Sequence, residues 1–422
     1  MTRFGHVMEK IDERIPGVDL PLMSVSQTRG VIRRSELTNA PQRAESLDNY
    51  KVCRANDIVF NKMSIRSGAM GVAAEDGLVT YHYEVMRPRE GTDPHFIVYL
   101  MKSSWFTKEL IKRERGIGAG DQANVRTTEV PFSVLKTIDA YIPAYAEQRA
   151  IANYLDRETA RIDGLVDEQQ HLIAMLHLRR LAVVDAALSQ GLGSEAVLRK
   201  TGSQWLPELP GGWEVVRAKR VLSFGPANGV SPAVGDTDDL KSLSLGAIRD
   251  GRVIMGPEVT KFVDRSSVAS TESLRLRPGD ILLVRGNGNV DLVARAGLVG
   301  SEFAVEEYIY PDLLIRVRVN SSMLPEFFVW ACNASPTRAQ VRAQARTAVG
   351  TFKVAGGDVR SLSLPLPPLD EQRAIVAYLD KQTSKIDTLI AETERFIELA
   401  RERRSALITA AVTGQIDVRE AA

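Results

Sequence analysis

The chain of 422 residues contains two cysteines, no long apolar run and almost no net charge. The cysteines, Cys53 and Cys332, lie far apart and form no Cys-x-x-Cys motif. Their spacing excludes a disulfide framework and a cysteine-rich zinc site, and it fits a reducing compartment. No stretch approaches the roughly 18 apolar residues of a membrane span, and the N-terminal segment carries charges where a signal peptide is apolar. These absences predict a cytoplasmic protein.

Charge is balanced, with 54 Lys and Arg against 53 Asp and Glu, which gives a net charge of +1. The balance excludes a uniformly basic nucleic-acid coat and an acidic tail protein, but it permits a local basic face. Hydrophobic residues make up 44% and charged residues 25%, as in a folded chain rather than a disordered one. At this length we expect two or three domains, each with its own core.

One segment near the middle of the chain recurs at its end. EQRAIANYLDRETARIDGL begins at Glu147, and EQRAIVAYLDKQTSKIDTL begins at Glu371, an offset of 224 residues (371 − 147). An offset of this size is not one of the short solenoid periods, so the sequence predicts two large copies of one unit.

Each copy of the recurring segment is predicted to form one long helix. Apolar residues recur at intervals of three and four, which indicates a coiled-coil-like seam. About 42 helical residues would extend about 60 Å, and the partner of matching length is the other copy. The seam residues are Ile151, Leu155, Ile162, Leu165 and Leu172 in the first copy, and Ile375, Leu379, Ile386, Leu389 and Phe396 in the second.

Four arginines near the helix ends allow two interpretations. Arg179, Arg180, Arg403 and Arg404 occupy equivalent positions in the two copies. They either fix the register of the helices or point outward, or they contact a partner protein or a DNA backbone.

A region of mixed β character precedes each helix. YKVCRANDIVFNK, starting at Tyr50, resembles SLRLRPGDILLVR, starting at Ser273, and runs of Val and Ile are broken by Gly, Asn and Asp as in strands joined by turns. The predicted fold class is therefore α+β, with two mixed α/β domains separated by two long helices. The predicted segments are domain 1 at 1–146, helix 1 at 147–192, a linker at 193–212, domain 2 at 213–370, and helix 2 with a tail at 371–422.

Two basic stretches are candidates for contact with nucleic acid. Arg338, Arg342 and Arg346 repeat every four residues and Lys353 follows, which on a helix would form a stripe suited to phosphate oxygens. The corresponding stretch of the first copy, KSSWFTKELIKRERG, is net positive and includes Lys108 and Lys112. The alternative is an ordinary solvated face.

Two turns are candidates for base recognition. Arg285, Asn287 and Asn289 follow a predicted strand in a glycine-rich turn, and Arg and Asn pair with guanine and adenine edges in the major groove. The analogous residues of the first copy are Lys62, Ser64 and Arg66. Asn and Gly could equally fill the turn for backbone reasons.

The sequence predicts no catalytic centre and no metal site. A GxxxxGK[ST] loop is absent, and GNGNV at Gly286–Val290 lacks the third glycine of a dinucleotide fingerprint. The only Pro-Pro pair is followed by Leu369, so the Pro-Pro-aromatic signature of an amino-methyltransferase is absent too. The histidines are scattered, and His171 and His177 lack the i, i+4 spacing of a helical zinc pair.

With these motifs in view, the chain resembles the DNA-specificity subunits of type I restriction-modification systems. The resemblance rests on the two EQRAI–YLD helices, on the approach LSLPLPPLDEQRAI, and on QWLPELPGGWEVVRAKRVL at 204–222. It implies two target recognition domains separated by antiparallel helices in a pseudo-twofold repeat, each domain reading half of a split, asymmetric DNA target. The first domain has no counterpart of Trp205–Trp213 before Arg3. We therefore expect domain 1 to lack its opening stretch here, either because the true start lies upstream or because this version dispenses with it.

The resemblance also implies partners and a non-catalytic role. Two methyltransferase subunits would dock on the helices and restriction subunits would join them, while S-adenosylmethionine, ATP and Mg²⁺ would be bound by those partners only. Double-stranded DNA is the expected ligand, in a host-defence system. The alternatives are a self-contained DNA-modifying enzyme, which cofactor-dependent modification by the chain alone would reveal, and a coiled-coil scaffold that never binds DNA. Salt-sensitive duplex binding weakened by Arg338, Arg342 and Arg346 to Ala would exclude the scaffold.

Overall fold

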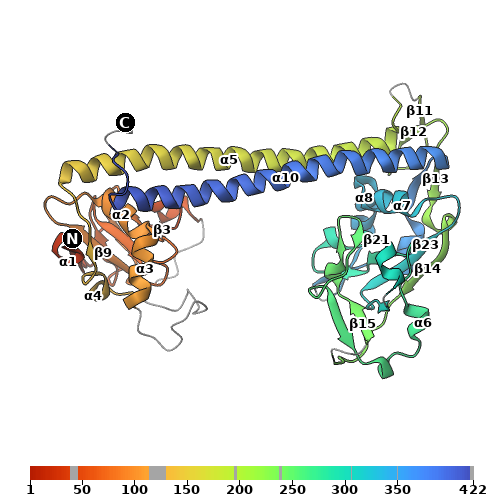
Figure 1. Ribbon diagram of the computed structural model, residues 1–422, viewed down its shortest axis with the longest axis horizontal. Helices are drawn as coiled ribbons and strands as arrows, with labels where there is room; N and C mark the ends of the chain where they lie inside the picture. The colour runs from red at the N-terminus through yellow and green to blue at the C-terminus, as the bar shows by residue number, and fades with distance from the viewer. Residues whose placement is uncertain are drawn as a thin grey trace. The chain divides into compact units, whose positions relative to one another are not determined.

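The structure is a computed structural model, and it describes residues 1–38, 46–113, 130–193, 197–236, 240–305, 307–348 and 350–418. The chain divides into two compact units, which we call unit 1 (Met1–His171 with Thr393–Ala422) and unit 2 (Leu172–Glu392). Two long helices, α5 (Tyr145–Gln190) and α10 (Leu369–Val412), each contribute to both units (Figure 1).

Unit 1 is built from short strands and helices that precede α5. They are β1 (Thr2–Arg3), α1 (Phe4–Val7), β2 (Met8–Ile11), β3 (Met23–Ser26), β4 (Gly30–Arg33), β5 (Lys51–Cys53), β6 (Ile58–Asn61), β7 (Met70–Val72), β8 (Gly77–Val79), β9 (Tyr83–Pro88), α2 (Pro94–Lys102), α3 (Ser104–Arg113), α4 (Phe132–Leu135) and β10 (Asp139–Ala140).

Unit 2 follows a similar order with added strands. Its elements are β11 (Leu198–Lys200), β12 (Glu208–Pro210), β13 (Glu214–Arg217), β14 (Leu222–Asn228), β15 (Leu240–Leu243), β16 (Ile248–Arg249), β17 (Arg252–Val253), β18 (Thr260–Val263), α6 (Thr271–Leu274), β19 (Ile281–Val284), β20 (Gly286–Asn287), β21 (Ala296–Val299), β22 (Tyr308–Ile309), β23 (Leu314–Val319), α7 (Pro325–Asn333), α8 (Ser335–Gln344), β24 (Arg346–Ala348), β25 (Thr351–Lys353), α9 (Gly356–Ser361) and β26 (Ser363–Leu366).

The central sheet has the same strand order in both units. In unit 1 the antiparallel order is β2-β9-β6-β7, and in unit 2 the order β14-β23-β19-β21 continues into β17 and β16. The chain therefore uses one β framework twice, and unit 2 extends it at one edge.

The strand between the second and the last of these four, β6 in unit 1 and β19 in unit 2, carries buried apolar residues on both faces (Ile58–Phe60 and Ile281–Val284), because the sheet is covered on both faces. Side chains alternate along a strand. In β6, Ile58 and Phe60 enter the core shared with the helices, whereas Val59 enters a smaller core formed by the outer strands. In β19, Ile281 and Leu283 face the helical core, and Leu282 and Val284 face the outer core. Each unit thus has a helical layer, a central sheet and an outer β layer.

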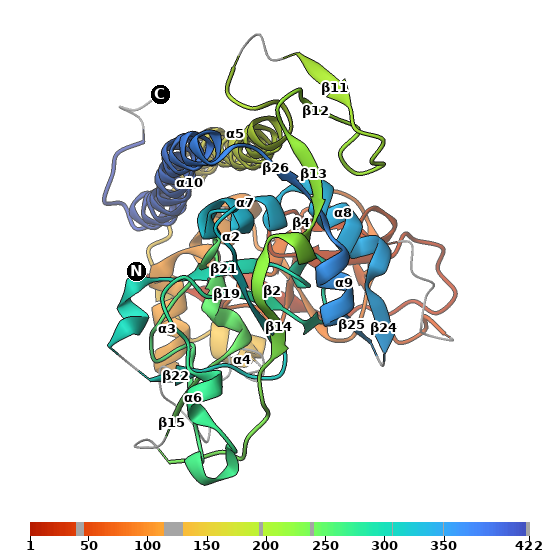
Figure 2. The ribbon, with the colours of Figure 1, turned by 90° about the vertical axis from the view of Figure 1, so that its right-hand side faces the viewer.

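The long helices run side by side, with α5 and α10 close together in both ribbon views (Figures 1 and 2). In unit 2, Leu176 near the end of α5 packs against Ile386 and Ile390, and Val184 shares a core with Leu379 further back along α10. The residue numbers rise on one helix as they fall on the other, so the pair is antiparallel.

Six of the ten predicted seam residues are buried and four are exposed. The buried residues are Ile151, Leu155, Ile162, Ile375, Leu379 and Ile386. The prediction is wrong for Leu165, Leu172, Leu389 and Phe396, which are 38 to 48% exposed. The buried positions continue at intervals of three and four through Val166 and Ile390. Leu165 and Leu389 each come one residue earlier, so their side chains point about 100° away around the helix and are exposed.

Two interhelical ion pairs resolve the interpretation of Arg180 and Arg404. In unit 1, Arg404 Nη2 donates to Asp163 Oδ2 at 3.1 Å. In unit 2, Arg180 Nε donates to Asp387 Oδ1 at 2.9 Å. The four residues are equivalent pairs in the repeat, so both arginines hold the helices in register. Arg179 and Arg403 are exposed, and their contact with a partner stays a prediction.

The glutamine of each EQRAI motif is buried and joins its helix to the preceding domain. Gln148 Nε2 donates to the carbonyls of Pro143 (2.8 Å) and Gly91 (3.1 Å), and its Oε1 accepts from the Asp93 N–H, just before α2. Gln372 Nε2 donates to Pro367 (2.9 Å) and Ser322 (3.0 Å), and its Oε1 accepts from the Leu324 N–H, just before α7.

The far end of the opposite helix completes each unit. The Ser104 N–H at the start of α3 donates to Thr409 Oγ1 of α10 at 3.1 Å. The Ser335 N–H at the start of α8 donates to Asp185 Oδ1 of α5 at 2.9 Å. Thr409 and Asp185 are equivalent positions of the repeat, so each domain is held by the beginning of the helix that follows it and by the end of the other helix.

The segment between α5 and β13 differs from the expected loop. Residues 198–210 form the antiparallel hairpin β11–β12, with Leu206 and Leu209 buried in the core of unit 2. These two buried leucines pack the Gly- and Pro-rich hairpin segment against the core of unit 2. Residues 194–196 lie outside the described part.

Replacing Gln148 or Gln372 by Ala should destabilise the unit to which the glutamine belongs. Each change leaves one buried N–H and two carbonyls without partners, so we expect a loss of about 2 to 4 kcal/mol in the free energy of unfolding. Urea unfolding followed by tryptophan fluorescence measures it. Gln170→Ala, at an exposed position of α5, is the control, and equal midpoints for all three variants would contradict the assigned role.

Candidate nucleic-acid interface

The turn after β19 carries the predicted base-reading residues of unit 2. Asn287 Oδ1 accepts from the Asn289 N–H, and Asn289 Oδ1 accepts from the Asp291 N–H, both at 2.9 Å. Each asparagine therefore shapes the turn, as the backbone interpretation proposed, while Asn289 is exposed and Asn287 is partly exposed. A carbonyl oxygen has a second lone pair and the amide nitrogen two donors, so both side chains keep capacity for a base edge.

A small sheet places two predicted residues, Arg346 and Lys353, close together. Strands β20, β25 and β24 pair in that order, with Gly286 opposite Lys353 and Lys353 opposite Arg346. Paired residues of neighbouring strands share a face, so Lys353 and Arg346 lie next to each other, and both are exposed. A Cβ at Gly286 would lie 3.0 Å from Lys353 Cγ, so glycine lets the lysine side chain cross the strand.

Arg285 precedes this sheet and is partly enclosed. Its Nη1 donates to the Asp312 carbonyl at 3.2 Å and lies 3.8 Å from Asp312 Oδ2, with about a third of the side chain exposed. The structure therefore joins Arg285, Asn287, Arg346 and Lys353 in one region of unit 2.

The predicted helical stripe of Arg338, Arg342 and Arg346 does not exist. Helix α8 ends at Gln344, and the extended Ala345 carries the chain into β24, so Arg346 lies on a strand. Arg338 is 8% exposed, and its Nη2 donates to the carbonyls of Val290 (3.2 Å) and Asp291 (3.1 Å). A regular spacing of four cannot reveal where a helix ends.

Arg338 and Arg342 both contact the turn after β19. Burial lowers the pKa of the Arg338 guanidinium to about 10, so it is still protonated at neutral pH. Arg342 is exposed, and its Nε donates to Asp291 Oδ1 at 2.8 Å. These two predicted DNA ligands hold the turn instead, although Arg342 keeps exposed donors.

In unit 1 the corresponding turn is Lys62–Ser67. Ser64 N–H donates to the Asn61 carbonyl, Ser67 Oγ donates to the Ser64 carbonyl, and Gln27 Nε2 from the β3–β4 turn donates to Ser67 Oγ at 3.0 Å. Lys62, Ser64 and Arg66 are partly exposed on this turn.

The predicted lysines of α3 lie on the surface of unit 1. Lys108 and Lys112 are exposed, and Lys112 Nζ donates to Glu109 Oε1 at 2.6 Å. The end of their basic stretch, 114–116, lies outside the described residues.

The first residue after the turn-bearing strand has the same kind of backbone partner in both units. The Val130 N–H donates to the Lys62 carbonyl, and the Val354 N–H donates to the Arg285 carbonyl.

A buried carboxylate before each turn-bearing strand supports the framework. Asp57 accepts from the Arg54 N–H and from Arg87 of β9, at 2.8 and 2.9 Å. Asp280 accepts from the Arg277 N–H and from Arg318 of β23. The paired carboxylates raise the pKa of Arg87 and of Arg318. Sequence comparison of the two copies aligns Arg54 and Asp57 with Arg277 and Asp280, but it misses the arginines on the neighbouring strand.

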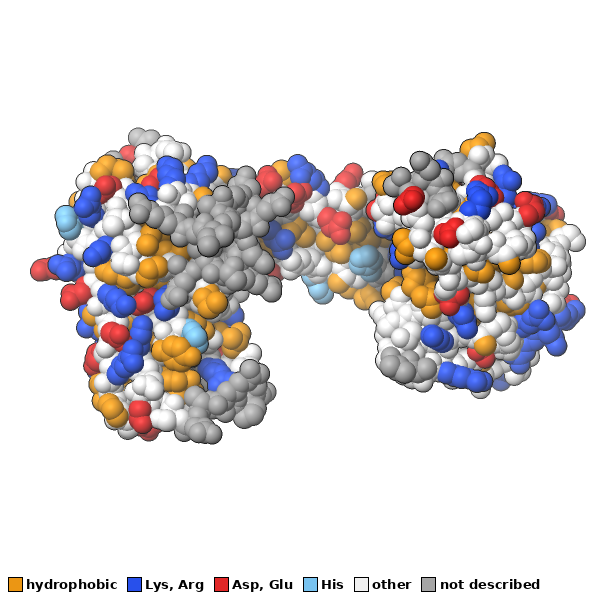
Figure 3. Space-filling view, turned by 90° about the horizontal axis from the view of Figure 1, so that it is seen from below, with side chains coloured by type: hydrophobic (Ala, Val, Ile, Leu, Met, Phe, Trp, Pro, Cys, Tyr) orange, Lys and Arg blue, Asp and Glu red, His pale blue; other side chains and the backbone are white. Residues whose placement is uncertain are grey.

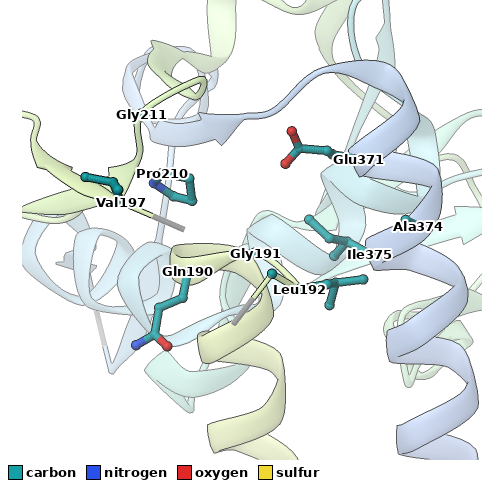
Figure 4. Close-up of a pocket in the computed structure, with 10 residues that line it drawn as sticks. Gln190, Gly191, Leu192, Val197, Pro210, Gly211, Glu371, Ala374 and Ile375 are labelled. Carbon is teal, nitrogen blue, oxygen red and sulfur yellow. The ribbon is translucent and has the colours of Figure 1, made fainter. Parts of the chain in front are cut away.

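A pocket in unit 2 lies away from this region. It has a volume of about 560 Å³ and is lined by residues from the end of α5, from the β11–β12 segment and from the start of α10, among them Gln190, Pro210 and Ile375 (Figure 4). Glu371, on its wall, accepts from Trp213 Nε1 at 2.6 Å. The Glu371 carboxylate thus links Trp213, just before β13, to the start of α10.

On the visible face of each unit, basic side chains lie in several places rather than in one field (Figure 3). In the space-filling view, Lys and Arg alternate with Asp, Glu and apolar side chains on the visible face of each unit (Figure 3). Attraction for phosphate therefore depends on where single cations are placed. Within the described ranges, no helix is long and apolar enough to cross a membrane, and no group of three His, Cys, Asp or Glu side chains could hold a metal ion.

The chain is similar to curated specificity subunits of type I restriction enzymes. It is 25% identical over 333 residues to the StySPI specificity subunit of Salmonella potsdam, covering 78% of this chain and 67% of that one. It is 25% identical over 342 residues to the EcoKI specificity subunit of Escherichia coli K12, covering 79% and 68%. A putative MjaX specificity subunit of Methanocaldococcus jannaschii is 22% identical over 392 residues, covering 89% and 82%. No family model matches.

Solved structures share the fold. A chain from a study of complex assembly and conformational transition of the type I R-M system superposes with a TM-score of 0.74 at 18% identity, covering 98% of this chain and 97% of that one. The HsdS subunit of Thermoanaerobacter tengcongensis superposes with a TM-score of 0.55 at 18% identity, covering 98% and 96%. The relatives are thus specificity subunits of type I restriction enzymes, and the solved structures show that this chain shares their fold.

Proposed function

We propose that this chain is the sequence-specific DNA-recognition subunit of a type I restriction-modification complex, with one unit for each half of a split, asymmetric target. The observation that carries the proposal is the repeated framework with different turns. Both units have the same sheet order, the same buried Asp–Arg pair and the same glutamine contact, yet the turn after the middle strand carries Lys62, Ser64 and Arg66 in unit 1 and Arg285, Asn287 and Asn289 in unit 2.

The chemistry of these turns suits a DNA duplex. Arg and Lys donate to guanine, Asn pairs with adenine, and Ser accepts or donates to either. Different side chains on one framework would read different bases. Arg346 and Lys353, on the small sheet beside the unit 2 turn, would bind phosphate and set the orientation of the unit.

The exposed apolar residues of the long helices suit two copies of one partner. Leu165 and Leu389 occupy equivalent positions, as do Leu172 and Phe396, and Met175 and Leu399, and all six are 38 to 51% exposed. Surfaces that recur in the two helices fit identical partners, which we take to be two methyltransferase subunits. Those partners, with restriction subunits where present, would bind S-adenosylmethionine, ATP and Mg²⁺ and carry out the chemistry.

The proposal is tested by mapping methylated sites in cells that carry this chain with its methyltransferase. We expect one split motif with a fixed gap, and unmodified DNA or a continuous motif would contradict the proposal.

Arg346→Ala and Lys353→Ala should each weaken duplex binding, roughly fivefold, because each removes a charge-assisted contact worth about 1 kcal/mol. The loss should be similar for target and non-target duplexes, and the salt dependence should fall by about one counterion per variant. Fluorescence anisotropy with labelled duplexes measures both. Arg373→Ala, on an exposed position of α10, is the control; affinity equal to that of the control would remove these residues from the interface.

Deleting one turn from both helices should shorten the gap. Removing Glu168–His171 together with Glu392–Arg395, which are equivalent positions outside the proposed docking residues, shortens each helix by about 6 Å, or one to two base pairs. We expect both half-sites to stay unchanged in a methylation map. Replacing the same eight residues by Ala keeps the length and should keep the gap. Changed half-sites with a constant gap would refute a spacer role.

Leu165→Glu combined with Leu389→Glu should weaken assembly with the methyltransferase more than tenfold, since burying each leucine contributes about 1.5 to 3 kcal/mol. Analytical ultracentrifugation measures assembly, and circular dichroism should show unchanged helix content. Arg157→Ala with Lys381→Ala, at equivalent exposed positions, is the control. Wild-type assembly of the Glu variant would place the docking surface elsewhere.

A further inference from the structure

A chain of contacts connects α8 with the turn of unit 2 that would face the bases. Arg338 Nη2 donates to the carbonyls of Val290 and Asp291. The Asp291 N–H donates to Asn289 Oδ1, and the Asn289 N–H donates to Asn287 Oδ1. The positions of both asparagines therefore follow from where the guanidinium sits.

The arginine is enclosed rather than available to DNA. It is 8% exposed, and its Nη1 is buried without a hydrogen-bond partner among the described residues. Burying a charged group in this way is costly unless it makes several contacts. The site therefore retains a guanidinium for the two turn carbonyls rather than for phosphate.

Unit 1 supports its turn differently. The residue of α3 that corresponds to Arg338 is Thr107, whose hydroxyl donates to the Ser103 carbonyl within the helix. The unit 1 turn is instead contacted by Gln27 from the β3–β4 turn. The residue that contacts the reading turn (the turn at Lys62–Ser67 in unit 1 and at Arg285–Asp291 in unit 2) therefore differs between the units, whereas the framework is shared.

We propose that Arg338 is a positioning residue for base recognition, which sets the specificity of the unit 2 half-site by holding Asn287 and Asn289 without contacting DNA. This inference rests on the proposed function. Arg338 then positions the turn and does not bind phosphate. Replacing it should reduce the discrimination between bases at the unit 2 half-site, while the affinity for nonspecific DNA stays the same. Arg342, bonded to the Asp291 carboxylate, supports the same turn from the surface.

The chain offers a matched control in Arg316. It is also buried in unit 2, at 4% exposure, and its guanidinium also donates to two backbone carbonyls, those of Arg275 (2.8 Å) and Ser273 (2.6 Å). Those carbonyls lie outside the reading turn. Arg338→Met and Arg316→Met therefore each remove two guanidinium-to-carbonyl bonds from the same unit, and only the first touches the turn. Arg316→Met also removes an ion pair with the buried Asp280 (3.7 Å), so it is the more severe test of lost stability.

The experiment maps methylated sites in cells carrying the full-length chain, or a variant, with its methyltransferase. We expect Arg338→Met to lower discrimination about tenfold at one or more positions of one half-site, the size of one lost base contact, with the other half-site and the gap unchanged. Arg338→Lys, which keeps a charged donor, should restore part of the discrimination. Arg316→Met should reduce the amount of methylation but keep the motif.

The outcomes separate the two proposals. A wild-type chain that directs no split motif would refute the proposed function. A wild-type split motif that Arg338→Met leaves equally strict would overturn the positioning role alone. A motif relaxed equally by Arg338→Met and Arg316→Met would also overturn it, because lost stability would then explain the effect.

Discussion

Each unit depends on one buried glutamine amide at the start of a long helix. An amide enclosed in protein is costly unless its donors and its acceptor are used, and Gln148 and Gln372 each use both. One amide bonds the segment that enters the helix and the residues just before α2 or α7. The direction in which the helix leaves its domain is thereby fixed. The ion pairs further along, at Asp163 and Asp387, form only because that direction brings the opposite helix alongside.

A buried polar group with all its hydrogen bonds made also holds the framework of each domain. The buried carboxylates Asp57 and Asp280 close the turn before the middle strand and bind an arginine from its neighbour, so that strand is held at its beginning and along its length. At its far end, the residue that follows the strand is bonded to the returning backbone at Val130 or Val354, and the turn itself is contacted by Gln27 in unit 1 and by Arg338 in unit 2. A turn on a strand anchored at the other end can change its side chains without disturbing the sheet, which is the property that recognition of different sequences requires.

The sequence predicted the long helices well, because two similar copies of a 3.5-residue pattern are a strong and local signal. Both helices begin within two residues of their predicted starts, and α5 ends two residues before its predicted end. Helix α10 ends at Val412, inside the predicted helix-and-tail segment 371–422. Four of the ten predicted seam residues are nevertheless exposed, since Leu165 and Val166 are equally apolar and periodicity cannot choose between adjacent positions. The arginine stripe failed for a different reason. Arg338 and Arg346 follow a helical spacing, but Ala345 has an extended backbone that ends the helix, and the spacing of the arginines does not mark that point. The role of Gln148 and Gln372 was visible only as an identity between the copies, without a chemical signal of what they bind.

Two levels of constraint follow from these contacts. The glutamines, the Asp–Arg pairs and the interhelical ion pairs recur at equivalent positions, so they serve what the two units have in common. The supports of the reading turns differ: Gln27 in unit 1 comes from the outer β layer, whereas Arg338 in unit 2 comes from the helical layer. A substitution in the shared set changes both what the unit reads and whether it folds. Under the proposed function, a substitution in a turn support would act on the half-site of its own unit, because Gln27 and Arg338 each contact the turn of the unit to which they belong. Residues such as Arg338 are therefore the places where specificity could change while the framework stays intact.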